Sequence, residues 1–406
     1  MNEIFSVGLI LMAAVLAGHL AQLARVPEVT GYLLVGIAIG PSALDLISHD
    51  NLRTLGFLSE VALGLILFNI GAIFEASNFR RVGRGVVRIT LWEASLAFVL
   101  VGVTLGALGL EWPLALLLAV VAMETAPATT LMVLNEYDAR GVMTERLLAL
   151  VALNNMYVLI TFGFVAAGLT FVQPTMEGWV LSTYRAIHGL GWAVIGSVAL
   201  GALLGLLTDL LAVRAKESGE TLILAIGAVL IDVGASRWLG LSPLISTLAL
   251  GATVANASTH GDRLLQGLGR VDPPLYAAFF VLAGAELVPS AVLNLGVVGV
   301  AYVVARAIGK IIGARIGLRG ENVPPVVRRQ LGYCLISSSS LAVGLTIQIR
   351  SAFPAYAATV TGVVLAAVVI FEIVGPLLTR RALVLTGEAR TMPAPLEEAS
   401  GADLAT

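Results

Sequence analysis

The chain is dominated by a succession of apolar runs, each of a length that lets one helix cross a lipid bilayer. A membrane-spanning helix needs roughly 20 apolar residues to cross about 30 Å of hydrocarbon. By this criterion we predict about thirteen spans, near residues 4–24, 30–48, 54–75, 86–109, 112–135, 144–172, 187–213, 219–236, 240–257, 272–289, 291–315, 327–348 and 354–379. Hydrophobic residues make up 58% of the chain and charged residues only 12%, as expected for an integral membrane protein. An all-α fold follows, because a helix in lipid satisfies its own backbone hydrogen bonds.

The basic residues predict how these spans are oriented, since cytoplasmic loops carry an excess of Lys and Arg. With the N-terminus outside, the outer loops contain only Arg53, Arg185, Arg237 and Arg350. The inner loops contain clusters such as Arg80, Arg81, Arg84 and Arg88, and Arg315, Arg319, Arg328 and Arg329. We therefore expect a multi-pass plasma-membrane protein with its N-terminus outside and its C-terminus in the cytoplasm. Residues 1–383 are predicted to form the transmembrane domain and residues 384–406 a disordered cytoplasmic tail.

Several classes of function are disfavoured by the motifs that the sequence lacks. It has no nucleotide-binding loop of the G-x-x-x-x-G-K-[ST] kind, which argues against an ATP-driven pump. No nucleophile is paired with a base and no residues have metal-ligand spacing, so we expect neither an enzyme nor a cofactor. The net charge of −2 is too small to suggest a nucleic-acid partner. Membrane lipid and a transported solute are the expected partners.

Two of the apolar runs are interrupted by polar residues near their middle. The run at 112–135 contains Glu124-Thr125-Ala126-Pro127, and the run at 327–348 contains Ser337-Ser338-Ser339-Ser340. A proline removes a backbone donor that lipid cannot replace, so such breaks persist only where they line a polar cavity. Interrupted spans in the two halves of a transporter are typical of a solute site near the membrane midplane.

Motifs along the whole chain resemble the monovalent cation:proton antiporter superfamily, whose members are sodium/hydrogen exchanger-like, and in particular its Kef-type branch. The opening signature is Arg25-Val26-Pro27, followed by Gly31-Tyr32-Leu33-Leu34, Gly36 and Gly40-Pro41. Further matches cover residues 57–71, 279–287, 306–313 with the pattern R-x-x-G-K-x-x-G, and 371–380. The matches lie at both ends and in the middle, so the resemblance covers nearly the whole chain.

The resemblance implies a fold of two inverted repeats with two crossed discontinuous helices, assembled as a homodimer. Core helices are expected near 86–172 and 291–379, panel helices that form the dimer near 4–75 and 219–289, and a connecting helix near 187–213. The implied function is secondary antiport of a monovalent cation, Na⁺ or K⁺, against protons by alternating access. The fifth and twelfth spans are the expected crossing pair.

The chain departs from the family in its sixth span. In the family, this span carries two adjacent polar residues, and the second is an aspartate that binds cation and proton in competition. This chain has Asn154-Asn155 instead. An amide oxygen can coordinate a cation, but the amide cannot take up a proton near neutral pH. Two alternatives therefore stay open: a diverged carrier without proton coupling, moving an anion such as bicarbonate, and a scaffold that transports nothing.

Glu124 is the candidate replacement for the missing aspartate, since it is a carboxylate at the break of the fifth span. In this hypothesis Glu124 binds the proton, and neutral oxygens at the ion site come from Thr125, Asn154, Asn155, Ser337, Ser338, Ser339 and Ser340. The alternative is a structural ion pair of Glu124 with Arg306 or Lys310.

Arg306 and Lys310 are four residues apart and so share one helix face. Intramembrane cations need partners, and these two are expected to balance Glu124, Glu372 and the carbonyl ends of the broken helices. If neither cation is paired, the site would be electropositive and suited to an anion. Glu372 is expected to fix the last helix against the core, and Asp232 to pair with a neighbour such as Arg237.

Overall fold

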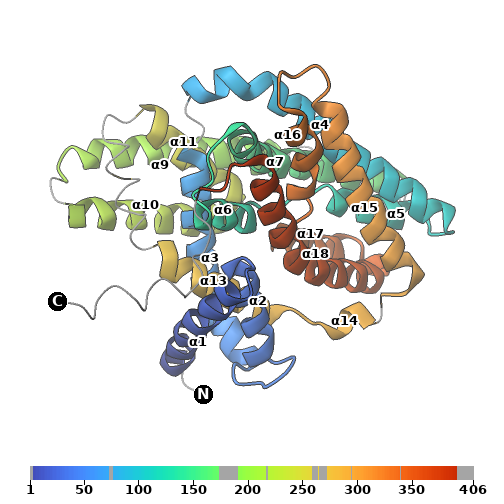
Figure 1. Cartoon of the computed structure of the whole chain (residues 1–406), viewed down its shortest axis with the longest axis horizontal. Coiled ribbons are helices and arrows are strands. Elements are labelled where there is room, and N and C mark those ends of the chain that lie inside the picture. The colour runs from blue at the N-terminus through green and yellow to red at the C-terminus, as the bar shows by residue number, and fades with distance from the viewer. Residues whose placement is uncertain are drawn as a thin grey trace, which may run out of the picture.

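The computed structural model describes residues 3–72, 76–172, 191–215, 218–257, 264, 272–293, 295–338 and 340–390. Every regular element within these ranges is a helix (Figure 1). In chain order they are α1 (Glu3–Leu23), α2 (Glu28–Ile39), α3 (His49–Ala72), α4 (Ala76–Ala107), α5 (Trp112–Ala122), α6 (Pro127–Glu136), α7 (Val142–Val172), η1 (Trp192–Gly196), α9 (Ser197–Ala212), α10 (Ser218–Trp238), α11 (Pro243–Ala257), α13 (Asp272–Glu286), α14 (Ser290–Leu293), α15 (Gly296–Gly317), α16 (Pro325–Cys334), α17 (Ser340–Ala352), η2 (Pro354–Tyr356) and α18 (Ala357–Thr386).

Nine helical segments among the described residues are long and apolar enough to cross a membrane. One of them is the broken pair α5 and α6, counted together over Trp112–Glu136. Three shorter apolar helices, α2, α11 and α17, add to these. The predicted all-helical, multi-span membrane architecture is confirmed, while the number of about thirteen spans stays a prediction.

The helices pack in two groups (Figure 1). In one group α4 packs against α5, α7 and α15, and α18 packs against α16 and α17. In the other, α13 packs against α2 and α3, and α11 packs against α3, α9 and α10. The short helix α6 contacts both groups, because it touches α7 and α18 on one side and α2 and α3 on the other. The break between α5 and α6 is therefore held close to the boundary between the groups.

The contact between α4 and α15 depends on glycines spaced four apart on α15. A Cβ added at Gly309 would lie 2.5 Å from the Cα of Ala97, and one at Gly313 would lie 2.5 Å from the Cα of Glu93. Small residues at this spacing let two membrane helices approach until their backbones touch. This approach explains the R-x-x-G-K-x-x-G pattern, and it sets Glu93 of α4 directly beside α15.

The end of the membrane domain differs from its predicted boundary at residue 383. Helix α18 continues to Thr386, and Glu388 beyond it is only 7% exposed. The Glu388 carboxylate accepts hydrogen bonds from the backbone N–H groups of Met143 (2.7 Å) and Thr144 (2.8 Å) at the start of α7. A carboxylate at a helix N-terminus binds free N–H groups and balances the positive end of the helix dipole. Glu388 thus holds the start of the predicted tail against the domain, and residues 391–406 lie outside the described residues.

Candidate functional site

The two predicted helix breaks are present and contact each other. Helix α5 ends at Ala122 and α6 begins at Pro127, which cannot donate to the preceding turn. Helix α16 ends at Cys334 and α17 begins at Ser340. The N–H of Ala126 donates to the carbonyl of Ser337 at 3.1 Å. The Thr125 hydroxyl donates to the carbonyl of Leu335 at 3.3 Å, so the backbone groups freed by one break are partly satisfied by the other. We call this contact the crossing.

Arg306 binds the carbonyl groups that end α5 and α16. Its Nε donates to Ala122 O at 3.1 Å, one terminal nitrogen donates to Ile336 O at 2.6 Å, and the other donates to Glu124 O at 2.7 Å and Ser337 O at 3.2 Å. The side chain is 1% exposed, and its guanidinium lies 4.2 Å from the ring centroid of Phe371. Two helix C-termini concentrate partial negative charge here, which a buried guanidinium balances. The predicted role of Arg306 at the broken helices agrees with these contacts.

Lys310 is held by a carboxylate that sequence analysis did not assign to it. Its Nζ lies 2.7 Å from Oε2 of Glu93, and both side chains are fully buried. The same Nζ donates to the hydroxyl of Thr125 at 2.7 Å and to the carbonyl of Met123. Of its expected partners, Lys310 binds the carbonyl end of α5 at Met123, but its counter-ion is Glu93 and not Glu124 or Glu372. A signal was present in the sequence, because Glu93 interrupts an apolar run and intramembrane carboxylates are rarely unpaired.

Asn154 completes this cluster around Glu93. Its amide nitrogen donates to Oε1 of Glu93 at 2.7 Å and to the carbonyl of Met123 at 2.8 Å. Both oxygens of Glu93 are thus engaged, one by Lys310 and one by Asn154. The Asn154 amide therefore links α7 both to α4 and to the end of α5.

Glu124 lies next to Arg306 and is fully buried. Its Oε2 is 3.9 Å from a terminal nitrogen of Arg306 and accepts a hydrogen bond from the Ser338 hydroxyl at 3.0 Å. The ion pair with Arg306, one of the two alternatives from the sequence, is therefore present. Its oxygens are 0% exposed and do not line the cavity described next.

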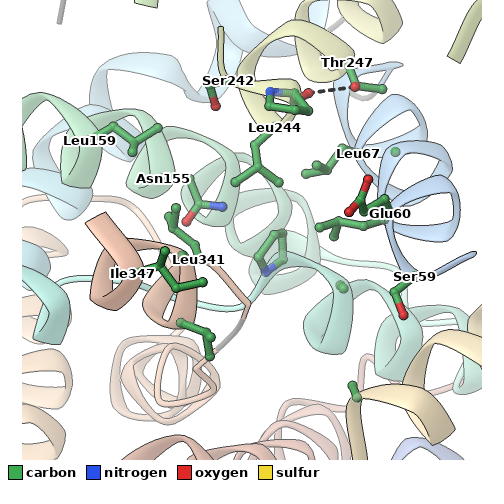
Figure 2. A pocket seen from close by; sticks show the side chains of 18 of the residues that line it. Ser59, Glu60, Leu67, Asn155, Leu159, Ser242, Leu244, Thr247, Leu341 and Ile347 are labelled. Carbon is green, nitrogen blue, oxygen red and sulfur yellow. Dashed lines mark hydrogen bonds between the residues drawn. The ribbon is translucent and has the colours of Figure 1, made fainter. Parts of the chain in front are cut away.

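A cavity of about 830 Å³ adjoins the crossing (Figure 2). Its walls come mainly from α3, α10, α11 and α13 of one helix group, from α7, α17 and α18 of the other, and from α6 between them. The lining is mostly apolar, and its polar members are Ser59, Glu60, Thr129, Asn155, Arg237, Ser242, Thr247, Glu286, Gln348 and Glu372. Pro127 and Ala128, at the start of α6, also line it, so the cavity ends at the break itself.

Glu372 and Asn155 are the predicted site residues that face this cavity. Glu372 is 8% exposed and accepts a hydrogen bond from the Thr129 hydroxyl at 2.9 Å. Within the part of the chain that the structure describes, Glu372 forms an ion pair with no basic side chain. Asn155 is 6% exposed, and its Oδ1 has no hydrogen-bond partner among the described residues. Figure 2 shows its amide between Leu159 and Leu341, directed into the cavity.

The serine run is divided between the break and the next helix. Ser337 and Ser338 lie in the break, where both are buried. Ser340 is the first residue of α17, and Ser339 lies outside the described residues. Nine of the predicted site residues therefore gather at the crossing or at the cavity floor, namely Glu124, Thr125, Asn154, Asn155, Arg306, Lys310, Ser337, Ser338 and Glu372.

Residues 9–384 match the family described as sodium/hydrogen exchanger, transmembrane. The chain belongs to this family. Sodium/hydrogen exchangers are secondary transporters and not enzymes, so the predicted class of function is confirmed.

The exchanger is similar to several characterised antiporters. A subunit of an ammonium/proton antiporter of Alkalihalophilus pseudofirmus is 25% identical over 349 residues, which cover 84% of this chain and 85% of that protein. A sodium/proton–potassium antiporter of Bacillus cereus is 25% identical over 346 residues, covering 83% and 85%. A potassium/proton antiporter of Shewanella oneidensis is 26% identical over 331 residues, which are 77% of this chain but only 54% of that protein.

The fold of this exchanger is similar to that of a solved antiporter. The sodium proton antiporter of Methanocaldococcus jannaschii matches 96% of this chain and 98% of its own, with a TM-score of 0.75 and 17% sequence identity. A second structure of that protein, at pH 8, matches with a TM-score of 0.68 and 18% identity. At this identity the likeness shows a common fold.

Arg237 and Asp232 of the exchanger do not pair with each other, in contrast to the prediction. Arg237 of α10 pairs with Glu60 of α3 near the cavity, where Arg237 is 60% exposed. Asp232, its expected partner, instead accepts hydrogen bonds from the hydroxyls of Ser246 and of Thr247, the latter at 2.8 Å. Residues five apart do not share a helix face, whereas residues three or four apart do. Asp232 is therefore turned toward α11 and Arg237 toward α3.

Proposed function

We propose that this exchanger moves a monovalent cation, Na⁺ or K⁺, against protons by alternating access, through a coupling site in which Asn155 stands where the family has an aspartate. The relatives named above exchange ammonium, sodium or potassium for protons. A cation substrate fits the cavity, whose floor offers a carboxylate, a hydroxyl and an amide oxygen from Glu372, Thr129 and Asn155.

The observation that carries the proposal is the charge balance around the crossing. Three buried carboxylates, Glu93, Glu124 and Glu372, face two buried cations, Arg306 and Lys310. A surplus charge in a membrane interior is costly and must be neutralised. One monovalent cation or one proton is enough to neutralise the surplus carboxylate, so binding of one removes the need for the other. Cation and proton would therefore compete even though the aspartate of the family is absent.

The charge balance also argues against an anion substrate. All the polar nitrogens of Arg306 are directed to carbonyl oxygens, and Lys310 donates to Glu93, Thr125 and Met123. Neither cation lines the cavity. A bicarbonate ion in the cavity would meet the carboxylate of Glu372 and no basic group at the floor.

The positions of the cavity walls support movement of one helix group against the other. The cavity lies between them, so a displacement of α6, α7, α17 and α18 against α3, α10, α11 and α13 would close one side and open the other. With the N-terminus outside, we place the cavity toward the outer side, because residues at the ends of α10 and α13 and at the start of α11 line it and that orientation puts these helix ends outside. We further propose that the second helix group forms a homodimer in the plasma membrane.

The proposal is tested with purified protein in proteoliposomes that contain a pH-sensitive dye. Adding Na⁺ or K⁺ to acid-loaded vesicles is expected to drive proton efflux, and bicarbonate is expected to drive no flux beyond that of protein-free vesicles. The variant Glu3→Gln, at an exposed position outside the cavity, is the matched control and should behave as the native chain. If no cation moves protons, the transport proposal is wrong and a scaffold role gains support.

A further inference from the structure

We infer that Glu372 is the carboxylate that binds the cation and the proton in turn, with Thr129 and Asn155 as its neutral ligands. The inference rests on the proposed exchange and assigns its site. It replaces Glu124, the candidate from the sequence, by a residue of the last helix, α18. Four observations lead to it: access to the cavity, the partners of each carboxylate, the open acceptor of Asn155, and the backbone around Glu372.

Access separates Glu372 from the other two carboxylates of the crossing. Glu372 lines the cavity and is 8% exposed, whereas Glu93 and Glu124 are 0% exposed and do not line it. An ion that arrives through the cavity therefore meets Glu372 before either of the other two carboxylates of the crossing. A carboxylate sealed behind the crossing would need the crossing to open before it could exchange.

The partners of the carboxylates make the same distinction. Glu93 is bound by Lys310 and Asn154, and Glu124 lies beside Arg306 and Ser338. Glu372 receives only the hydroxyl of Thr129 among the described hydrogen bonds, at 2.9 Å. A hydroxyl can donate to a carboxylate or rotate and present its oxygen to a cation. The surplus negative charge of the crossing is thus located on Glu372.

Asn155 provides an independent sign of a ligand. Its side chain is 6% exposed, its Oδ1 has no hydrogen-bond partner among the described residues, and it lines the same cavity (Figure 2). Buried polar groups are nearly always satisfied, so an open acceptor needs an explanation. A cation, or the proton carried by Glu372, would satisfy it. Alkali cations prefer oxygen ligands of this kind, as hard cations do generally.

The backbone of α18 adds a further oxygen at the same residue. Pro376 lies inside the helix, four residues after Glu372, and has no N–H to donate to the Glu372 carbonyl. The next residue back, Gly375, lies against Ser337 of the crossing, where an added Cβ would be 2.1 Å from the serine Oγ. The Glu372-to-Pro376 segment therefore combines a carbonyl that lacks its usual helical donor, an ionisable side chain and direct contact with the second break.

The exchange step at Glu372 balances in atoms and charge. Protonated Glu372 is neutral and leaves the crossing with two carboxylates against two cations. When the proton leaves to water in the cavity, a cation binds the carboxylate and restores the same total. One proton is released for each monovalent cation bound, so transport is electroneutral. The cavity of about 830 Å³ leaves room for water molecules to complete the coordination of the bound ion.

Replacing Glu372→Gln, with Glu3→Gln at an exposed position outside the cavity as its control, tests the assignment in the full chain. Two quantities are measured: cation-driven proton flux in proteoliposomes, and protons released when Na⁺ or K⁺ is added to the detergent-solubilised protein in weak buffer. We expect Glu372→Gln to lose both, and Glu3→Gln to retain both. If Glu372→Gln retains both, Glu372 is not the coupling group and the exchange proposal survives. If the native chain shows neither, the exchange proposal itself is wrong.

Two further variants keep the test decisive if Glu372→Gln folds poorly. Thr129→Val removes only a neutral ligand, and we expect it to weaken the apparent cation affinity about tenfold, the usual effect of losing a hydrogen bond to a charged group. Asn155→Asp added to Glu372→Gln returns a carboxylate to the same cavity, and we expect it to restore proton release. An unchanged affinity in the first variant together with no restoration in the second would overturn the assignment.

Discussion

The ammonium nitrogen of Lys310 and Oε2 of Glu93 lie 2.7 Å apart in a place with no exposure to solvent, and they join α15 to α4. The amide of Asn154 binds the other oxygen of Glu93, and the hydroxyl of Thr125 binds Lys310. Three helices and the break between α5 and α6 thus meet at one buried ion pair. The ion pair holds the break between α5 and α6 in place, whereas Glu372 lines the cavity.

Breaking this pair on one side is expected to destabilise the protein strongly. Glu93→Gln leaves Lys310 as a buried charge without its counter-ion, which costs about 3–5 kcal/mol. The double variant Glu93→Gln with Lys310→Met removes both charges and should recover most of that loss, because paired charges contribute little beyond their apolar replacements. Thermal unfolding in detergent, followed by size-exclusion chromatography, measures both. Equal losses in the single and double variants would contradict the pairing.

Arg306→Lys is expected to destabilise the crossing although the charge is kept. A lysine cannot reach the four carbonyl oxygens that the guanidinium binds, and it presents no planar surface to Phe371. We expect the free energy of unfolding to fall by about 2–4 kcal/mol, because buried carbonyl oxygens lose their charged hydrogen-bond donor. The control Arg237→Lys, at a pair whose arginine is 60% exposed, should change stability by less than about 1 kcal/mol. Similar effects at the two positions would refute the role of Arg306.

The glycine contact between α4 and α15 predicts a steric effect. Gly313→Ala places a methyl group 2.5 Å from the Cα of Glu93, so the two helices must separate. We expect a destabilisation of about 1–3 kcal/mol from overpacking. Gly227→Ala on α10 is the matched control, because a Cβ there meets no atom within 4 Å. The control should be neutral or slightly stabilising, since alanine favours helix, and an equally mild Gly313→Ala would show that the helices do not touch.

Glu388 is expected to act as a cap for α7. Glu388→Ala removes the acceptor of the Met143 and Thr144 N–H groups, which should cost about 0.5–2 kcal/mol. The effect should be local, appearing as faster amide hydrogen exchange in the first turn of α7. Exchange that is unchanged at residues 142–146 would show that the cap contributes nothing.

The orientation of the cavity is open to a labelling test. Cys334 is the single cysteine of the chain and is buried, so Cys334→Ala provides a background for introduced thiols. Ser242→Cys, which lines the cavity, should react with a membrane-impermeant maleimide added to intact cells. Glu145→Cys, at the exposed start of α7, should react only in inverted vesicles. The opposite pattern would reverse the proposed orientation.

Several features of the site follow from local sequence. The break before α6 was predictable because Pro127 cannot donate a backbone hydrogen bond and Glu124 is polar in an apolar run. The role of Arg306 was predictable because broken helices leave carbonyl groups that need a cation. The family was predictable because its motifs recur along the whole chain, and residues 9–384 match it.

Other features were not predictable, and they concern which charged groups meet. Thr125 and Asn154 were assigned to the ion, but the structure uses them to bind Lys310 and Glu93. Asp232 was assigned to Arg237, but it binds Ser246 and Thr247. Each of these choices depends on the rotation and depth of one helix relative to another, which apolar periodicity does not specify.

The sequence by itself determined that this chain is a helical membrane protein with two interrupted spans, because lipid tolerates unpaired backbone groups only beside a polar cavity. Only the tertiary structure decided which carboxylate is neutralised and which one faces the cavity. The reason is the close approach of α4 and α15 at Gly313, which brings Glu93 to Lys310 and leaves Glu372 with the hydroxyl of Thr129. Electrostatic pairing acts over a few ångströms, and such distances between distant segments are set by packing.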